Sequence, residues 1–417
     1  MKYGLIGEKL SHSFSAQIHN RLFDYEYELK ELSAAELEPF LTKRDFYAIN
    51  VTIPYKESVI PYLDVVDDNA LRIGAVNTIV NRDGRLYGYN TDFLGLKALI
   101  ERNGMVVRDK KVLVLGSGGT SKTAMAVVLS MGCREVYRVS RTERDGCITY
   151  EQALRDHNDT EVLINTTPCG MYPNAGASAV AIDDYPCLEA VVDVVYNPLR
   201  TKLVCDALAR GIPAIGGLYM LVAQAAFAAE RFVGCSVEAH RIDEIYNALL
   251  REKENIVLIG MPASGKTTVG HRLAEDLKRA FMDTDAQIVS DIGCSIPEMF
   301  RERGEVAFRD AESRVVRSIA SVQGAVIATG GGAILRPDNV QALKENGRLY
   351  FLDRSTERLI ATADRPLSSN REDLEKRFAE RYSIYTAVCD RQIEADGTVE
   401  TVANLIREDF IHENIGH

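Results

Sequence analysis

The stretch IVLIGMPASGKTT, from Ile256 to Thr268, is the feature that most constrains this chain of 417 residues. Four apolar residues that favour β-structure lead directly into the pattern G-x-x-x-x-G-K-T, which begins at Gly260 and ends at Thr267. In such a strand–loop–helix the backbone N–H groups surround phosphates, the lysine reaches the outer phosphates, and the threonine hydroxyl can hold Mg²⁺. The stretch therefore predicts a nucleotide-binding domain. A second, unrelated nucleotide-binding pattern precedes it in the chain.

Length and composition limit the class of protein. The chain is too long for a single core, so we expect two or three domains, and its 46% of apolar residues indicates packed globular domains. A net charge of −11 argues against nucleic-acid or acidic-membrane partners. The eight cysteines include no C-x-x-C pair, which is typical of reduced thiols in a cytosolic enzyme. No uncharged apolar stretch approaches the ~18 residues of a membrane span, so we expect a cytoplasmic protein. We also expect a monomer or a homodimer.

Residues before position 93 read as an α/β unit. The strongest local signal is the hairpin at 78–90, with Asp83-Gly84 at its turn. The other predicted elements are strands at 3–7, 25–32 and 46–54, helices at 13–23 and 34–42, and a helix after Pro54.

The pattern restarts at Lys111, where KVLVLG runs through glycines into the helical TAMAVVLSMG. A strand that opens through glycines into a helix is the dinucleotide-binding fingerprint. Further strands at 135–140, 162–167 and 190–196, separated by helical spacers, predict a doubly wound parallel sheet. Helices at 218–232 and 239–250 close this region.

The phosphate-loop domain is expected to follow a short exposed linker of charged and polar residues, 251–255. Its later strands are predicted at 281–285, 325–330, 348–353 and 391–395, which makes a five-stranded parallel sheet with the first strand. Each half is long enough to bury a core of its own, so we expect 1–252 and 253–417 to fold independently.

Four polar clusters in the first part lie at predicted strand ends or loops, where sites usually lie. Each alone has a structural reading, such as a helix cap or a hairpin end. They are SHSFS (11–15), NVTIPYK (50–56), AVNT (75–78) and NTD (90–92), and later in the chain follow NTTPCGM (165–171), DVVYNP (193–198) and GLYMLVAQA (217–225). In this order the seven motifs resemble the shikimate dehydrogenase family, from residue 3 to about 250.

The resemblance implies a catalytic pair, Lys56 and Asp92, for NADPH-dependent reduction of 3-dehydroshikimate to shikimate. Hydride transfer to a ketone builds negative charge on its oxygen, so a proton donor such as a lysine beside a carboxylate suits the reaction. The resemblance also implies a substrate domain of residues 1–92, completed by helices at about 218–250, and a Rossmann NADP domain of residues 93–217. Shikimate would be bound by Ser13, Ser15, Thr52, Asn77, Thr91 and Gln224.

The residues after the second strand of the dinucleotide-binding unit indicate whether the cofactor is NAD or NADP. An NAD enzyme places Asp or Glu there, whereas this chain has Arg141 and Arg144, which suit the 2′-phosphate of NADP. Two departures from the usual pattern weaken individual contacts: Ser121 replaces the third glycine, and Ser140 replaces the family's usual Asn. The implied NADP contacts are Gly116, Gly118, Gly119, Thr120, Ser121, Arg141, Thr142, Arg144, Gly217 and Met220.

A second constellation follows the phosphate loop. Asp283 and Asp285 are expected on one face of a strand, and Arg309 and Glu312 on one helical face, where a surface ion pair is the ordinary alternative. With ATGGG (328–332), DRPL (364–367) and RYSIY (381–385), this set resembles shikimate kinase over residues 256 to about 410. That family phosphorylates shikimate with ATP and Mg²⁺, and the resemblance implies a kinase domain of residues 256–417.

The resemblance assigns these residues to three groups. Lys266, Asp285 and Arg365 would be catalytic, and Thr267 and Asp283 would hold Mg²⁺. Shikimate would be bound by Asp285, Arg309, Gly331, Gly332 and Arg381, since planar guanidinium groups grip a carboxylate well. The implied ATP contacts are Gly260, Ala263, Ser264, Gly265, Lys266, Thr267, Thr268 and Arg358.

Shikimate is the product of the first reaction and the substrate of the second, so the two resemblances predict a bifunctional enzyme of aromatic biosynthesis. Two alternatives stay open. One half could be a non-catalytic regulatory module, or the first half could be an NAD-dependent quinate/shikimate dehydrogenase.

Overall fold

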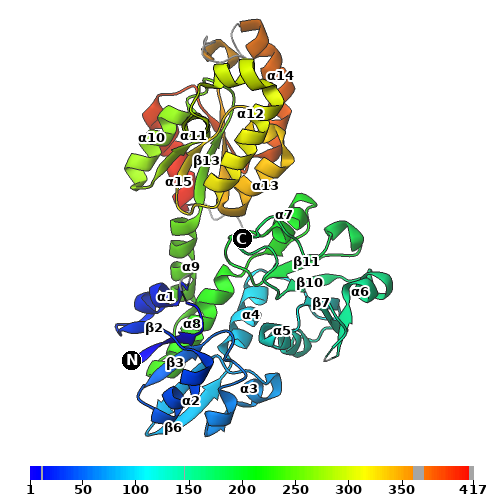
Figure 1. The fold of residues 1–417 in the computed structure, drawn as a ribbon, viewed down its shortest axis with the longest axis vertical. Helices are drawn as coiled ribbons and strands as arrows, with labels where there is room; N and C mark the ends of the chain where they lie inside the picture. The colour runs from blue at the N-terminus through cyan, green and yellow to red at the C-terminus, as the bar shows by residue number, and fades with distance from the viewer. Residues whose placement is uncertain (11–12, 145, 360–370, 413–417) are drawn as a thin grey trace. The chain divides into compact units, whose positions relative to one another are not determined.

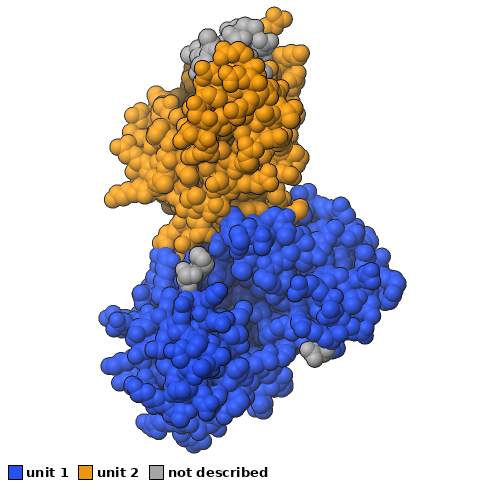
Figure 2. Space-filling model, viewed as in Figure 1, with its two compact units in different colours: residues 1–197, 206–248 blue, residues 198–205, 249–417 orange. Residues whose placement is uncertain are grey.

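The computed structural model describes residues 1–10, 13–144, 146–359 and 371–412. The chain divides into two compact units, the first made of residues 1–197 and 206–248 and the second of residues 198–205 and 249–417 (Figures 1 and 2). No helix in the described part of the chain combines the length and the apolar character needed to cross a membrane. Both units are α/β, as predicted.

The first sheet of unit 1 is mixed, with the strand order β2-β1-β3-β5-β6-β4. The predicted hairpin is present as β5 and β6, and its turn residues Asp83 and Gly84 have φ of 52° and 83°, as a type I′ turn requires. The strands are β1 (Tyr3–Gly7), β2 (Tyr27–Glu31), β3 (Ala48–Val51), β4 (Val65–Val66), β5 (Thr78–Arg82) and β6 (Arg85–Tyr89), with helices α1 (Ser15–Leu22), α2 (Ala34–Lys43) and α3 (Asp68–Ile73).

The helix predicted directly after Pro54 is not an α-helix. Turns follow β3, and then a single turn of 3₁₀ helix spans Ile60–Tyr62. Pro54 and Pro61 lie only seven residues apart in the sequence, and each lacks the N–H that a continuous α-helix needs. The segment therefore stays irregular, and it is this segment that carries Lys56.

The second sheet of unit 1 is entirely parallel, with the strand order β12-β11-β10-β7-β8-β9. The chain builds outward from β7 in both directions, so a crevice opens outside the carboxyl ends of β7 and β10, where doubly wound sheets bind ligands. The strands are β7 (Lys111–Leu115), β8 (Glu135–Ser140), β9 (Cys147–Thr149), β10 (Val162–Asn165), β11 (Ala190–Asp193) and β12 (Ala214–Ile215), with α5 (Gly119–Ser130) and α6 (Tyr150–His157).

Three further helices lie between strands of different sheets in the sequence. α4 (Thr91–Arg102) lies between β6 and β7, and α8 (Leu218–Val233) and α9 (Ala239–Lys253) follow β12. α4 packs closely on α8 because Gly95 has no side chain: a Cβ there would lie 2.8 Å from Cβ of Gln224. α7 (Lys202–Ala209) begins in the segment that belongs to unit 2.

Unit 2 contains the predicted five-stranded parallel sheet, in the order β14-β15-β13-β16-β17. In Figure 1, α10 and α15 cover one face of the sheet, and α12 and α13 cover the other. The strands are β13 (Asn255–Ile259), β14 (Phe281–Asp283), β15 (Val326–Ala328), β16 (Gly347–Asp353) and β17 (Arg391–Glu394), and the helices are α10 (Lys266–Leu277), α11 (Thr284–Ile292), α12 (Ile296–Ala320), α13 (Pro337–Asn346), α14 (Arg371–Val388) and α15 (Val399–His412).

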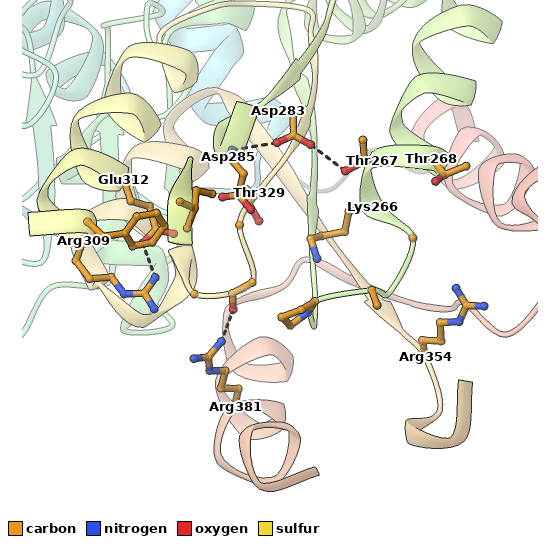
Figure 3. A pocket seen from close by; sticks show the side chains of 18 of the residues that line it. Lys266, Thr267, Thr268, Asp283, Asp285, Arg309, Glu312, Thr329, Arg354 and Arg381 are labelled. Atoms are coloured by element: carbon orange, nitrogen blue, oxygen red, sulfur yellow. Dashed lines mark hydrogen bonds and ion pairs between the residues drawn. The ribbon is translucent and has the colours of Figure 1, made fainter. Parts of the chain in front are cut away.

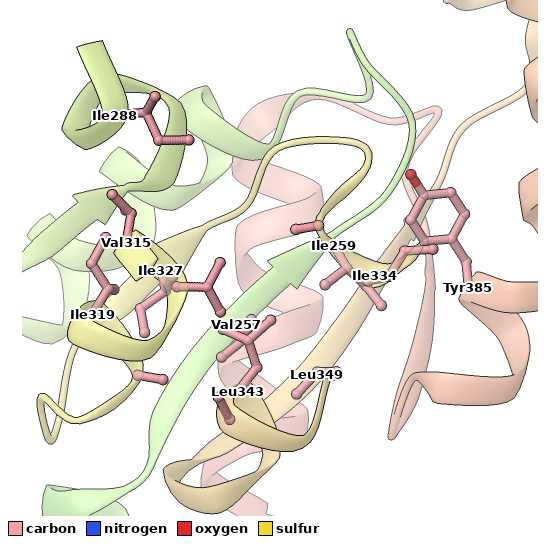
Figure 4. Close-up of a cluster of buried hydrophobic side chains, with 14 of the residues drawn as sticks. Val257, Ile259, Ile288, Val315, Ile319, Ile327, Ile334, Leu343, Leu349 and Tyr385 are labelled. Atoms are coloured by element: carbon pink, nitrogen blue, oxygen red, sulfur yellow. The ribbon is translucent and has the colours of Figure 1, made fainter. Parts of the chain in front are cut away.

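Alternate side chains of the central strands form two separate cores, as the period of two in a strand requires. Val257 and Ile259 of β13 pack with Val315 and Ile319 of α12 and with Tyr385 of α14 (Figure 4). Ile256 and Leu258, on the other face, pack against α10 and α15. Because β13 is buried on both faces, the loop that follows it is held on a rigid base.

The predicted linker 251–255 is not an exposed tether. Residues 251–253 end α9, Asn255 begins β13, and the side chains of Glu254 and Asn255 are buried. The carboxylate of Glu254 lies 2.9 Å from Nη2 of Arg348 and 3.2 Å from Nη2 of Arg200, a residue of the 198–205 segment of unit 2. The expectation of an exposed linker is wrong because two arginines distant in sequence neutralise this glutamate and allow it to be buried.

Candidate active sites

A cavity of about 510 Å³ in unit 1 brings together residues from stretches far apart in the sequence. It contains side chains from both the predicted substrate group and the predicted NADP group. The lining residues among those predicted are Ser13, Ser15, Thr52, Lys56, Asn77, Asp92, Thr120, Gly217, Met220 and Gln224, and Lys9, Asn50 and Tyr196 line it as well.

The predicted catalytic pair forms in this cavity. Nζ of Lys56 lies 2.6 Å from Oδ2 of Asp92, and the two side chains are 18% and 11% exposed. Asp92 lies in the first turn of α4, where the helix dipole favours a negative charge, and Asn90 caps that helix by accepting a hydrogen bond from the N–H of Phe93. The ammonium group is therefore held by a carboxylate while it remains open to the cavity.

Asn77 is fixed by a buried hydrogen-bond network. Its Nδ2 donates to Oγ1 of Thr91 at 3.0 Å and to Oε1 of Gln224 at 3.5 Å, and its Oδ1 accepts from the N–H of Thr91 at 2.7 Å. Thr91 is 1% exposed and does not line the cavity; it holds Asn77 from behind. Asn50 is a residue that sequence reasoning left without a role: it accepts from the Tyr27 hydroxyl at 2.8 Å and donates to Thr78.

Ser13 and Ser15 lie at the start of α1 and face the same cavity. Oγ of Ser13 donates to Oγ of Ser15 at 3.1 Å and accepts from the N–H of Ser15 at 3.2 Å. The two hydroxyls therefore present a paired hydrogen-bonding edge to a ligand. Ser11 and His12 lie outside the described residues.

The first residue of the loop between β7 and α5 has to be glycine. Gly116 has φ of 127°, and a Cβ there would lie 2.4 Å from Oγ1 of Thr166. A Cβ on Gly217 would lie 2.1 Å from the carbonyl oxygen of Val194. Ser121, which replaces the third glycine, is buried and donates to the carbonyl of Gly118 at 2.7 Å, so the departure is absorbed inside the loop.

The loop after β8 carries the predicted 2′-phosphate arginines, and Arg141, Thr142 and Arg144 are all exposed. Nη2 of Arg144 donates to Oγ of Ser117 in the glycine loop at 2.6 Å, which ties this arginine to the dinucleotide crevice. Ser140 donates to the carbonyl of Thr142 and so shapes the same turn. Lys122, at the start of α5, pairs with Glu57 at 2.9 Å.

A second cavity, of about 370 Å³, lies in unit 2 at the carboxyl ends of its strands (Figure 3). Of the phosphate-loop residues predicted to contact ATP, Ala263, Gly265, Lys266, Thr267 and Thr268 line it, whereas Gly260 and Ser264 do not. Gly260 and Gly265 have φ of 147° and 95°, and Ala263 also has a positive φ of 66°. Nζ of Lys266 donates to the carbonyls of Gly260 at 2.9 Å and Met261 at 2.7 Å.

Thr267 and Asp283 form the pair predicted to hold Mg²⁺. Oγ1 of Thr267 donates to Oδ2 of Asp283 at 2.8 Å. The described residues contain no group of three or more His, Cys, Asp or Glu side chains suited to a metal. The donor set still fits Mg²⁺, which binds proteins through one or two oxygen ligands and takes the others from water and phosphates.

Asp283 and Asp285 do not share a strand face as expected. β14 ends at Asp283, whose Oδ1 accepts from the N–H groups of Asp285 and Ala286 at 3.0 and 3.2 Å and so starts α11. The strand pattern was overridden by this helix cap. Both carboxylates nevertheless line the cavity, with Asp285 in the first turn of the helix.

The predicted carboxylate-binding end of the cavity carries Arg309 and Arg381. The Arg309–Glu312 pair does not lie on the surface: Arg309 is buried and donates to Oε2 of buried Glu312 at 2.8 Å. Burial raises the pKa of Glu312 against the opposing effect of Arg309, and burial lowers the pKa of Arg381. Nη1 of Arg381 donates to the carbonyl of Gly331 at 3.0 Å. A Cβ on Gly332 would lie 2.2 Å from Nη1 of Arg309, so a larger residue at this position would displace that guanidinium group.

Of the two other arginines predicted for unit 2, only Arg358 belongs to the described residues. Arg358 is exposed, donates to the carbonyl of Asp396, and does not line the cavity. Arg365 lies outside the described residues. Arg354, which sequence reasoning missed, does line the cavity. Its position at the end of the strand next to β13 was the available signal, but reading it requires the order of the strands.

Comparison with known proteins identifies both parts of the chain. A family model for the shikimate dehydrogenase substrate binding domain matches residues 5–79, and the shikimate kinase family model matches residues 262–410. The shikimate dehydrogenase (NADP(+)) of Clostridium beijerinckii is 38% identical over 267 residues, which cover 60% of this chain and 98% of the relative.

Solved structures of shikimate dehydrogenases also resemble the first part of this chain. Shikimate dehydrogenase 1 from Peptoclostridium difficile is 35% identical with a TM-score of 0.55, covering 60% of this chain and 98% of that one. Shikimate 5-dehydrogenase from Thermus thermophilus, solved in complex with NADP(H) and shikimate, is 28% identical with a TM-score of 0.55, covering 60% of this chain and 99% of that one. The chain is therefore an enzyme of the shikimate dehydrogenase family that also carries a shikimate kinase domain.

Proposed function

We propose that this chain catalyses two consecutive reactions: NADPH-dependent reduction of 3-dehydroshikimate to shikimate, and ATP-dependent phosphorylation of the 3-hydroxyl of shikimate. The observation that carries the proposal is that one chain holds two separate cavities, each with its own reactive residues. One contains the Lys56–Asp92 pair, and the other contains Lys266 beside Thr267 and Asp283.

In unit 1, the reduction needs a hydride and a proton, and NADPH supplies the hydride when it is bound. Lys56 donates the proton to the carbonyl oxygen as that oxygen becomes negative, and Asp92 holds the ammonium group in position. Asn77 and the Ser13–Ser15 hydroxyls orient the ring through hydrogen bonds. The residues present fit the cofactor, because the glycine loop leaves open space beside its backbone at Gly118, where a Cβ would meet nothing within 4 Å.

NADP is the dinucleotide that we propose, because Arg141 and Arg144 follow β8 where an NAD enzyme has an acidic residue. The Arg144–Ser117 hydrogen bond supports this proposal by tying one of the two guanidinium groups to the glycine loop. Two parallel N–H donors suit a phosphate group better than a ribose hydroxyl.

In unit 2, ATP with Mg²⁺ supplies the phosphoryl group when it is bound. Lys266 stabilises the outer phosphates, and Thr267 with Asp283 would hold the ion. Arg309 and Arg381 would grip the carboxylate of shikimate, and Asp285 would accept the proton of the attacking hydroxyl. Arg365 remains a proposed lid arginine that meets the transferring phosphate, and Arg358 a proposed adenine contact.

We further propose the domain limits implied by the two families: a substrate domain of 1–92 completed by helices at about 218–250, an NADP domain of 93–217, and a kinase domain of 256–417. We propose a cytoplasmic location, because both NADPH and ATP are supplied there, and a monomer or homodimer as the assembly.

The test is to measure both half-reactions separately on the purified full chain. NADPH loss with 3-dehydroshikimate and ADP formation with shikimate are both expected. If one reaction is absent while the other proceeds, the silent half is a regulatory module. If quinate with NAD⁺ is turned over faster than shikimate with NADP⁺, the first half is a quinate/shikimate dehydrogenase instead.

A further inference from the structure

The order of the strands in unit 2 places Arg354 next to the phosphate loop. β16 pairs in parallel with β13, so both strands end at the same edge of the sheet. β13 continues into the phosphate loop, and β16 ends at Asp353, directly before Arg354. The fold therefore sets this arginine beside the loop, although Arg354 lies 88 positions after Lys266 in the sequence.

The Arg354 side chain lines the nucleotide cavity together with Gly265 and Thr268. Its Nη1 would lie 3.7 Å from a Cβ placed on Gly265, the residue that precedes α10. Figure 3 shows Arg354 on the opposite side of Lys266 from Arg309 and Arg381, and on the same side as Thr268. The cavity thus has cations at both ends, with the phosphate-loop lysine between them.

The hydrogen-bonding state of Arg354 differs from that of the other cavity cations. Lys266 donates to loop carbonyls, Arg309 to Glu312, and Arg381 to the carbonyl of Gly331. Nε of Arg354 is buried and has no hydrogen-bond partner among the described residues. The nearby carboxylate of Asp396 is engaged by the N–H and hydroxyl of Ser355, both at 3.0 Å.

A guanidinium group left with open N–H donors beside the amino end of a helix selects a phosphate. Its planar fork matches two phosphate oxygens, and the backbone N–H groups at the start of α10 favour the same charge. Lys266 and Thr267 serve the outer phosphates and Mg²⁺, whereas Arg354 lies beyond them on the side of Thr268, away from the carboxylate-binding end.

We propose that Arg354 binds the α-phosphate of the nucleotide, one of the two phosphates that stay on the nucleotide when the γ-phosphate is transferred. This inference rests on the proposed nucleotide site of unit 2. A contact of this kind is present in both ATP and ADP, so it contributes to binding the nucleotide and not to the transfer step. Arg354 is a positioning residue for the cofactor by this reading.

The test compares Arg354→Ala, Arg354→Lys and the control Arg272→Ala in the full chain. Arg272 is also on unit 2, in α10, but it pairs with Asp276 and does not line the cavity. Calorimetric binding of ATP, ADP and adenosine is measured with NADP⁺ present to saturate the dinucleotide crevice of unit 1. Thermal unfolding of each variant shows whether unit 2 remains folded.

Arg354→Ala should weaken ATP and ADP by the same factor, about 10- to 100-fold, because charge-assisted hydrogen bonds to phosphate are lost. Adenosine should bind as before, Arg354→Lys should lose less than Arg354→Ala, and Arg272→Ala should match the parent chain. The kcat for ADP formation at saturating ATP should stay near the parent value while KM for ATP rises.

Three results would overturn the proposal. Unchanged ADP affinity in Arg354→Ala would remove the contact altogether. An equal loss for adenosine would place Arg354 on the base or ribose. A loss confined to ATP, with a fall in kcat, would place it on the γ-phosphate. If the parent chain binds ADP but does not phosphorylate shikimate, the proposed kinase reaction fails while the Arg354 test still stands; if it does not bind ADP, both fail.

Discussion

The ammonium group of Lys56 lies 2.6 Å from the carboxylate of Asp92, across 36 positions of sequence. Neither residue belongs to the sheet. Lys56 lies in the irregular segment after β3, and Asp92 lies in the first turn of α4. The pair forms because β5 runs antiparallel to β3 and β6 runs antiparallel to β5, so β6 ends at the same edge of the sheet as β3 and α4 starts near the segment that carries Lys56.

Lys56→Ala should lower the turnover of 3-dehydroshikimate by about 100- to 10,000-fold, which is the usual contribution of a general acid. The affinity for NADPH should barely change. Lys97→Ala is the matched control, since Lys97 is a lysine of α4 that pairs with Glu101 on the surface. Steady-state rates and NADPH binding measure both effects, and near-normal turnover in Lys56→Ala would exclude this lysine from the mechanism.

Replacing both Arg141 and Arg144 by Ala should remove most of the preference for NADPH over NADH. Each charge-assisted contact to the 2′-phosphate contributes roughly 1.5–3 kcal/mol. The measurement is the ratio of kcat/KM for the two cofactors, with Arg155→Ala, an exposed arginine paired with Asp156, as control. If discrimination persists in the double variant, the phosphate is recognised by another cation, for which Lys122 at the start of α5 is our candidate.

Asp283→Asn separates the metal-binding role of Asp283 from its structural role. Asn caps a helix about as well as Asp, so α11 should keep its start and the thermal stability of unit 2 should change little. The lost charge should raise the Mg²⁺ concentration needed for ADP formation by at least about tenfold. A magnesium titration of kinase turnover checks this, and dehydrogenase activity should be unaffected. An unchanged Mg²⁺ requirement would remove Asp283 from the metal site.

His19 should make unit 1 less stable in acid. Burial lowers the pKa of His19 to about 3, and its ring stacks on Tyr27 and bonds the hydroxyl of Tyr25. The unfolded chain takes up the proton near pH 6.5 whereas the folded chain does not, so this contribution is complete above pH 6.5 and is lost as the pH falls towards 3.

The slope due to His19 should approach about 1.4 kcal/mol per pH unit between these values. Denaturant unfolding at pH 7, 6 and 5 measures it, following the transition that NADP⁺ shifts. His19→Phe should lose this part of the pH dependence, even if it is less stable at pH 7. An identical slope in the variant would show that other groups cause the acid sensitivity.

Arg200→Ala should destabilise unit 2 by roughly 3–5 kcal/mol, because it removes one partner of a buried charge. Besides its ion pair with Glu254, Arg200 donates to the carbonyls of Lys344 at 2.9 Å and Gly347 at 2.7 Å. The unfolding transition that ATP shifts reports on unit 2, and Arg272→Ala is the exposed control.

The contacts of Arg200 also predict how a truncated chain behaves. A fragment of residues 253–417 lacks Arg200 and should unfold at a lower temperature than unit 2 of the full chain. Equal stability of the fragment would show that residues 198–205 are dispensable and would restore the expectation of independent halves.

Local patterns determined much of this protein before any tertiary information. The phosphate loop, the glycine loop after β7, the Asp83-Gly84 turn and the five parallel strands of unit 2 all follow from residues close together in sequence. Such features are readable because a turn needs a positive φ and a buried strand needs a run of apolar residues, and both demands act within a few positions.

Tertiary structure alone decided the features that depend on partners from distant parts of the chain. Asp285 lies in a helix and not in the predicted strand, because Asp283 caps the start of that helix. Glu254 is buried because Arg200 and Arg348 neutralise its charge. Arg354 entered the nucleotide cavity instead of Arg358 because β16 lies next to β13. A charged residue looks alike in sequence whether it meets water, an ion-pair partner or a ligand; its surroundings are set by strand order and packing, which local patterns do not contain.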